Sequence, residues 1–195
     1  NDEQAMINGA SVFMIPDGCE NQELDLLIEP YYKWKRITTT LNSYKGSYDR
    51  FIAKNYDELI DSPIEIGNHK IYSIECRGAT HEYAITSTGN IDTNIIIEDS
   101  KKIVKEIQSL FDDKPPYNHY IFFLHLTNNS FGGLEHCNSC SMIYDRNGFK
   151  NRKKYLRFLG LVSHEFFHTW NVKRIRPKEL GPFDYYNEVY TKLLW

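Results

Sequence analysis

Hydrophobic and polar positions alternate through the first third of the chain, and this alternation predicts short β-strands. β-Branched and aromatic residues, bounded by Pro, Gly and Asn, concentrate in residues 10–15, 24–29 and 32–41, as is typical of strands separated by turns. The pattern lapses in the segment "NSYKGSYDRF" and then resumes in a different register. We therefore expect residues 1–53 to be the C-terminal part of a β-rich domain and residues 54–195 to be the N-terminal part of a second domain.

In the second domain the hydrophobic period changes between that of strands and that of helices. Alternating apolar residues predict strands over residues 69–76 and 82–86. A strongly apolar run after Pro115 and Pro116 predicts a further strand over residues 119–126.

Two segments of the second domain carry apolar residues at helical spacing. Residues 99–111 predict an amphipathic helix, with Asp99 or Ser100 at its N-cap. Residues 151–170 predict a buried helix. Between the two predicted helices, the glycine-rich residues 130–144 are expected to form loop and extended chain. Strands and helices in this order predict an α+β fold with a mixed sheet.

Composition narrows the classes of function. The formal net charge of the 195 residues is -3, which argues against a nucleic-acid-binding surface. No apolar run approaches the roughly 18 residues that a membrane span needs. The four cysteines are irregularly spaced and do not resemble a disulfide framework, so the pair in "CNSC" is expected to be incidental.

The strongest candidate for chemistry is the segment "HEFFH" on the second predicted helix. A spacing of four places His164 and His168 on one helical face, where both imidazoles can reach one zinc ion, Zn2+. Glu165 lies about 100° around the helix from His164. It is thus positioned to take a proton, as general base, from a water that the zinc activates.

The residues around this motif resemble a known family. The segment "HEFFHTWNVKRIRPKELGPFDYYNEVYTKLLW", together with "FGGLEH" and "DSPIEIG", resembles the glycyl aminopeptidase family of zinc metallopeptidases over residues 61–195. The resemblance implies a thermolysin-like catalytic domain of the gluzincin type, an N-terminal β domain and a C-terminal PDZ domain. It also implies release of N-terminal residues from peptides, with a preference for glycine or alanine.

The resemblance assigns roles to individual residues. It implies that His164 and His168 bind zinc, that Glu165 is the base, and that Glu135 binds the free α-amino group of a peptide substrate. A carboxylate on an edge strand suits a cationic N-terminus, and Gly132 and Gly133 let the peptide backbone approach closely.

A catalytic zinc site normally takes three protein ligands. Two arrangements compete for the third ligand. Glu188 follows His168 at a spacing similar to that of thermolysin's third ligand. Alternatively, residues 190–195, whose apolar pattern is typical of a helix without a stop signal, resemble the start of a family signature. The resemblance implies that the third ligand is a glutamate a few residues after Trp195, and we expect this second arrangement. The sequence then covers only part of the catalytic domain, and alone it is expected to be inactive and to hold zinc weakly.

Two other functions compete with a zinc aminopeptidase. The first is a binding module that holds peptide N-termini around "GGLEH" without hydrolysing them. The second is an endopeptidase of thermolysin type, which does not require Glu135. Among the remaining candidates, the five other histidines have no partner at ligand spacing. The cations Lys173, Arg174 and Arg176, just after the helix that carries "HEFFH", are expected to be structural.

Overall fold

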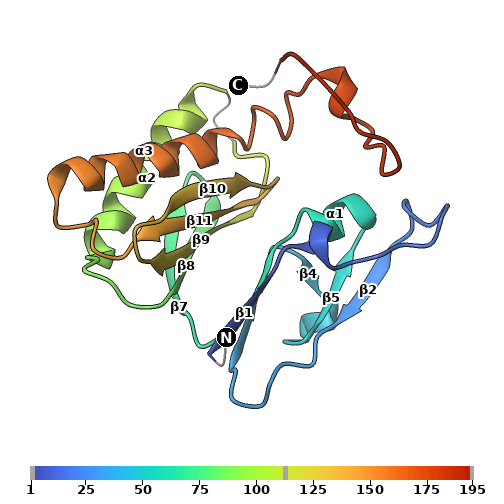
Figure 1. The fold of residues 1–195 in the computed structure, drawn as a ribbon, viewed down its shortest axis with the longest axis horizontal. Helices are drawn as coiled ribbons and strands as arrows, with labels where there is room; N and C mark the ends of the chain where they lie inside the picture. The colour runs from blue at the N-terminus through green and yellow to red at the C-terminus, as the bar shows by residue number, and fades with distance from the viewer. Residues whose placement is uncertain (1–2, 112–113, 194–195) are drawn as a thin grey trace.

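The computed structural model describes residues 3–111 and 114–193. Figure 1 shows two bodies of secondary structure, a smaller one formed by the first strands of the chain and a larger one formed by a sheet covered by two helices. None of the described helices is both long enough and apolar enough to cross a membrane. The mixture of helices with a mixed sheet confirms the α+β fold class.

The smaller body contains two three-stranded antiparallel sheets and a short helix. The first sheet has the order β1-β6-β3, and the second the order β2-β5-β4. Their bounds are β1 Gln4–Ile7, β2 Leu24–Leu27, β3 Arg36–Thr38, β4 Asn42–Ser43, β5 Arg50–Ala53 and β6 Ile64–Gly67, with helix α1 over Tyr56–Ile60 and 3-10 turns over Gly9–Ser11 and Tyr44–Gly46.

The larger body is a five-stranded sheet of order β10-β11-β9-β8-β7. β8, β9 and β11 are parallel to one another, whereas β7 and β10 are antiparallel to their neighbours. The bounds are β7 Lys70–Cys76, β8 Ala79–Thr86, α2 Thr93–Ser109, β9 His119–Thr127, β10 Phe131–Glu135, β11 Ser139–Asp145 and α3 Arg152–Phe167, followed by a 3-10 turn over Lys178–Leu180.

Strand β9 is buried on both of its faces, which accounts for the continuous apolar run in its sequence. Tyr120, Phe122 and Leu124 are fully buried in the core shared with α2 and α3. Ile121 and Phe123 are fully buried on the opposite face, against Met6 of β1. A strand covered on both faces reads as an unbroken apolar run. The sheet is thus held between the helices and the smaller body, with β10 left as an edge strand.

Several predicted elements are wrong in extent. Residues 10–15 form a 3-10 turn and irregular chain rather than a strand, and within residues 32–41 only β3 is a strand. Helix α2 begins at Thr93, several residues before the predicted start, because the Asp92 side chain accepts hydrogen bonds from the amides of Asn94 and Ile95. The segment expected to be loop and extended chain is a regular antiparallel hairpin of β10 and β11.

The expected helix at residues 190–195 is also wrong where the structure describes it. Residues 190–193 are irregular, and Leu194 and Trp195 lie outside the described residues. The preceding chain is held to the smaller body, since the Tyr186 hydroxyl donates to Asp17 at 2.6 Å and that of Tyr185 donates to Asp57. Leu193 is 70% exposed and Tyr190 77% exposed, so these side chains do not make the apolar contacts that stabilise most helices in proteins.

The packing around Ala53 indicates where the boundary between the two domains lies. Ala53 lies inside one apolar cluster with Tyr56 and Leu59 of α1 and Ile66 of β6. Strand β6 also pairs with β1 and β3. We therefore propose that the division falls after Gly67 and that the predicted boundary at Ala53 is too early.

A buried histidine in the larger body makes stability depend on pH. His81 is fully buried beside the Tyr117 hydroxyl, 3.0 Å from its Nε2, and this burial lowers its pKa to about 4. The unfolded chain binds this proton near pH 6.5, so the stabilisation is present above that pH and is lost as the pH falls toward 4.

We expect His81→Gln to flatten the loss of stability in acid. Between pH 6.5 and pH 4 the free energy of unfolding should fall by about 3 kcal/mol less than in the unsubstituted chain. Urea unfolding at a series of pH values measures this difference, and the constant effect of the substitution itself cancels. If the free energies of unfolding of the two proteins fall by the same amount between these pH values, the prediction is wrong.

Candidate active site

The predicted histidine pair lies at the C-terminal end of α3. His164 is exposed, whereas His168, which caps the helix, is 2% exposed. Their Nε2 atoms are 3.1 Å apart. Two nitrogens that bind one tetrahedral zinc ion at 2.0–2.1 Å lie about 3.3 Å apart. The histidines therefore meet at the separation that a shared zinc ion requires.

A hydrogen bond fixes the tautomer of His168. Its Nδ1 lies 2.6 Å from the carbonyl oxygen of Asn171. A carbonyl only accepts, so Nδ1 carries the proton and Nε2 keeps a lone pair for a metal. Orientation of a ligand histidine by a backbone carbonyl is typical of metal sites. Sequence reasoning did not identify Asn171, because its contribution comes from the backbone.

Two carboxylates converge on the same point as His168. Glu135, at the end of β10, and Glu165, on α3, each offer one oxygen that lies within 4.8 Å of the other and of a His168 ring nitrogen. Such a group, with both carboxylates partly or fully buried, suits a cation. The structure thus brings Glu135, Glu165 and His168 together beside the histidine pair, and the chemistry of these donors is compatible with zinc.

Glu165 is held in an unusual environment. It is 4% exposed, and its Oε2 has no hydrogen-bond partner among the described residues. Burial raises the pKa of this carboxyl group to about 7, and the nearby Glu135 carboxylate adds to the rise. A buried carboxylate with an unpaired oxygen is a candidate for proton transfer.

Gly133 makes room for the Glu165 carboxylate. A Cβ atom built on Gly133 would lie 2.1 Å from Oε1 of Glu165, whereas one on Gly132 would meet only Ile143, at 3.7 Å. The two glycines therefore differ in role. Only Gly133 borders the carboxylate, although both glycines line a cavity of about 320 Å³ together with Met6 and His125.

The turn after Glu135 is tied to the chain that follows α3. The Asp61 carboxylate accepts hydrogen bonds from Lys173 Nζ at 2.7 Å and from the Cys137 amide at 2.8 Å, and His136 Nδ1 lies 3.3 Å away. Burial alone would raise the pKa of Asp61. The His136 hydrogen bond and the Lys173 charge outweigh it, however, and hold the pKa well below its usual range.

Arg174 reinforces the same connection. Its guanidinium donates to the carbonyl oxygens of Thr169, at 2.7 Å, and of Cys137, at 2.9 Å, and to Asn138 Oδ1 at 3.0 Å. Together with Lys173 it fixes the hairpin that carries Glu135 relative to the end of α3. This contact joins residues far apart in the sequence, so spacing alone could not reveal it.

The remaining candidates lie elsewhere. Glu188 is exposed, and its carboxylate accepts a hydrogen bond from Tyr190. Cys137 and Cys140 are free thiols; Cys140 is fully buried opposite Glu135 in the β10–β11 register, and its burial, with the charge of Glu165, raises its pKa. The other histidines have polar partners outside α3: His69 with Thr38, His81 with Tyr117, His119 with Glu82, His125 with Glu65 and His136 with Asp61.

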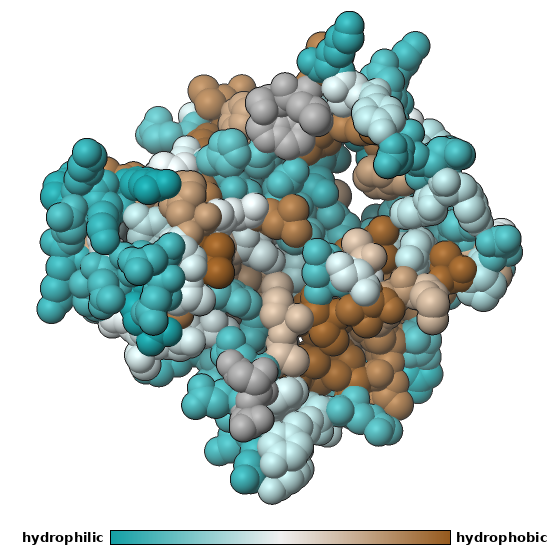
Figure 2. Space-filling view, in the orientation of Figure 1, coloured by the Kyte–Doolittle hydropathy of each residue, from teal (hydrophilic) through white to brown (hydrophobic). Residues whose placement is uncertain are grey.

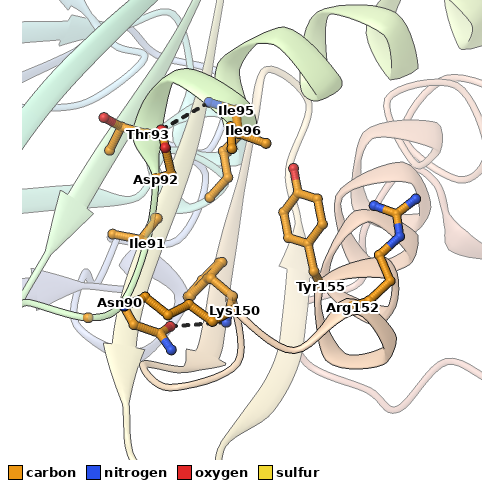
Figure 3. A pocket seen from close by; sticks show the side chains of 11 residues that line it. Asn90, Ile91, Asp92, Thr93, Ile95, Ile96, Lys150, Arg152 and Tyr155 are labelled. Carbon is orange, nitrogen blue, oxygen red and sulfur yellow. Dashed lines mark hydrogen bonds between the residues drawn. The ribbon is translucent and has the colours of Figure 1, made fainter.

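A cavity of about 780 Å³ lies at the opposite end of α3 from the histidines. Figure 3 shows Asp92 and Ile95 at the start of α2 facing Tyr155 and Arg152 at the start of α3. Two of its polar groups are already engaged, since Asp92 caps α2 and the Tyr155 hydroxyl donates to Asp99 at 2.8 Å. Because this cavity lies at the other end of α3, it is separate from the candidate active site.

Comparison with known proteins gives a consistent result for both ends of the chain. Residues 157–195 match the family described as M61 glycyl aminopeptidase, and residues 1–68 match the Peptidase M61 N-terminal domain. A crystal structure of an aminopeptidase N family protein from Idiomarina loihiensis is 31% identical, with a TM-score of 0.93. That match covers 100% of this chain but only 35% of the other chain. Among curated proteins, none matches.

Proposed function

This chain belongs to the M61 glycyl aminopeptidase family, and we propose that the protein is a zinc-dependent aminopeptidase with its active site between α3 and β10. The convergence of Glu135, Glu165 and His168 carries the proposal. The preference for N-terminal glycine or alanine is proposed from the family alone.

His164 and His168 would hold the zinc ion through their Nε2 atoms. Their separation of 3.1 Å and the Nδ1 hydrogen bond of His168 to Asn171 support this role. When bound, zinc polarises the scissile carbonyl and lowers the pKa of the attacking water toward ~7.

Glu165 would act as the general base. Its free Oε2 can accept a proton from the attacking water and pass it to the leaving amine. Gly133, which leaves space beside this carboxylate, also presents its backbone at the open edge of the sheet. A peptide extended along that edge would pair with β10 by backbone hydrogen bonds.

Glu135 would bind the ammonium group of the substrate. Its position at the end of the edge strand, within reach of Glu165 and His168, supports recognition of a cation one residue from the scissile bond. For the third zinc ligand, the exposed carboxylate of Glu188, already hydrogen-bonded to Tyr190, gives no support to that residue. We propose a carboxylate from outside the described residues.

The role of Glu135 separates the aminopeptidase from its competitors. In the full-length protein, Glu135→Ala should lower kcat/KM for peptides with a free N-terminus by at least about 30-fold, because a desolvated ammonium loses its partner. Turnover of N-acetylated peptides should be low and little changed. Parallel assays of matched free and acetylated glycyl peptides, with zinc content measured for each variant, provide the comparison.

Each competing function gives a different result. Cleavage of acetylated peptides at a rate equal to that of free ones would indicate an endopeptidase. Binding of free peptides without any cleavage would indicate a binding module. Loss of zinc from Glu135→Ala would instead place Glu135 among the metal ligands.

A further inference from the structure

An arginine and an aromatic ring lie together at the start of β10, opposite the end that carries Glu135. The Arg157 guanidinium carbon is 3.9 Å from the centroid of the Phe131 ring. Phe131 is 46% exposed, and Arg157 is exposed on α3. Both side chains are therefore accessible to a ligand.

Arg157 is aligned with the proposed zinc ligands. It precedes His164 by seven residues, which places it on the same helical face and about 10 Å along the axis. Figure 1 shows α3 and β10 running side by side in the same direction. Phe131 lies beside Arg157, and Gly133 lies beside Glu165, so the two elements stay together along this length.

A bound substrate would run along β10, between Glu135 and Phe131. A peptide paired with the open edge of β10, with its ammonium group at Glu135, would extend toward Phe131. The five residues from Phe131 to Glu135 are separated by four steps, which span about 13 Å in a strand. An extended peptide of three or four residues would therefore bring its C-terminal carboxylate close to Arg157.

The Arg157 guanidinium has donors available for such a carboxylate. A guanidinium whose face packs on an aromatic ring keeps its N–H groups, which lie in its plane, for bidentate hydrogen bonds. Within residues 3–111 and 114–193, the ion pairs do not include Arg157. By contrast, its neighbour Lys154 is paired with Asp145 at 2.9 Å.

We propose that Arg157, supported by Phe131, forms a subsite that binds a substrate carboxylate three or four residues from the N-terminus. This inference rests on the proposed function and names the substrate class: short peptides with opposite charges at their ends. In a longer peptide, an acidic side chain at the same position would supply the same chemistry. Figure 2 shows a hydrophilic surface around the start of α3, in contrast to the apolar area over the smaller body.

The test compares carboxylate with amide in the full-length protein. Alanyl tetrapeptides ending in a free carboxylate or in a carboxamide are assayed with the unsubstituted enzyme, Arg157→Gln and Arg152→Gln. Arg152 is the matched control, because it lies on the same helix but lines the separate cavity. A second pair of substrates, hexapeptide amides with Glu or Gln at the fourth position, distinguishes the side-chain source from the C-terminal one.

We expect KM to be about 10-fold lower for the free carboxylate than for the amide in the unsubstituted enzyme, as for a hydrogen-bonded charge pair. Arg157→Gln should abolish this difference with little change in kcat, and Arg152→Gln should retain it. Equal affinity for acid and amide in both substrate pairs, or a preference that survives Arg157→Gln, would overturn the subsite.

Calorimetric binding to Glu165→Gln separates this inference from the proposed function. That variant should bind the tetrapeptide acid about 10-fold more tightly than the amide, and the double variant with Arg157→Gln should bind them equally. Absence of cleavage in every assay, with this binding preference intact, would refute the peptidase and keep the carboxylate subsite. Equal binding of acid and amide in both variants would refute the subsite, whatever the turnover.

Discussion

Replacing Glu165 by glutamine is expected to lower turnover by about 100 to 10,000-fold, the range that a general base commonly contributes. The structure gives three reasons. The carboxylate is buried, its Oε2 has no hydrogen-bond partner among the described residues, and its pKa is raised to about 7. Glutamine has nearly the same shape, so it removes the proton acceptor and leaves the packing intact.

The same substitution should leave zinc in place. Glu165 follows His164 on the helix, and in the proposed arrangement the metal is held by His164 and His168 rather than by Glu165. Metal analysis of the purified Glu165→Gln protein should therefore match that of the unsubstituted enzyme. His168→Ala is the comparison that should lose zinc. If Glu165→Gln also loses its zinc, the division of roles between base and ligands is wrong.

Much of the larger body could be predicted from sequence. The apolar run of β9 and the helical spacing in α3 reflect burial that is local to each element, and local burial determines hydrophobic period. The pair His164 and His168 depends only on the geometry of one helix. Prediction was weaker in the smaller body, where short strands such as β4 are formed by pairing with β5, a long-range contact.

The environment of the site could be predicted less well than its motif. Glu135 was identified through resemblance, but its approach to Glu165 depends on how α3 packs on β10. Asp61 lies 75 residues before His136 and 112 before Lys173, and sequence spacing does not report contacts at such distances. The expected helix at residues 190–195 had the right period in the sequence. Over residues 190–193, which the structure describes, the apolar side chains Tyr190 and Leu193 are exposed, and tertiary packing, which sequence period does not report, is what stabilises most helices.

The role of Gly133 gives a prediction with a large effect at a residue without a side chain. Gly133→Ala is expected to lower kcat by about 100-fold, the loss that a displacement of about 1 Å in a reacting group produces. The added Cβ would lie 2.1 Å from Oε1 and 2.2 Å from the carboxyl carbon of Glu165. The Glu165 carboxylate must therefore move away from the position from which it accepts the proton.

Folding should be affected much less than catalysis. The atoms that the new Cβ meets are the carboxyl group and Cγ of Glu165, and a change of side-chain rotamer can move them without moving the backbone of α3 or β10. The melting temperature of Gly133→Ala should thus remain close to that of the unsubstituted protein. Gly132→Ala is the matched comparison on the same strand, since its Cβ meets only Ile143, at 3.7 Å, and its loss of kcat should be much smaller.

A double substitution tests whether the two residues act through this contact. Glu165→Asp shortens the side chain by one methylene group and withdraws the carboxylate from β10, leaving space for the alanine methyl group. Residues in contact show non-additive effects, so Gly133→Ala should lower kcat less in the Glu165→Asp background than in the unsubstituted enzyme. Equal losses in the two backgrounds would mean that Gly133 acts through the bound peptide backbone and not through the position of the Glu165 carboxylate.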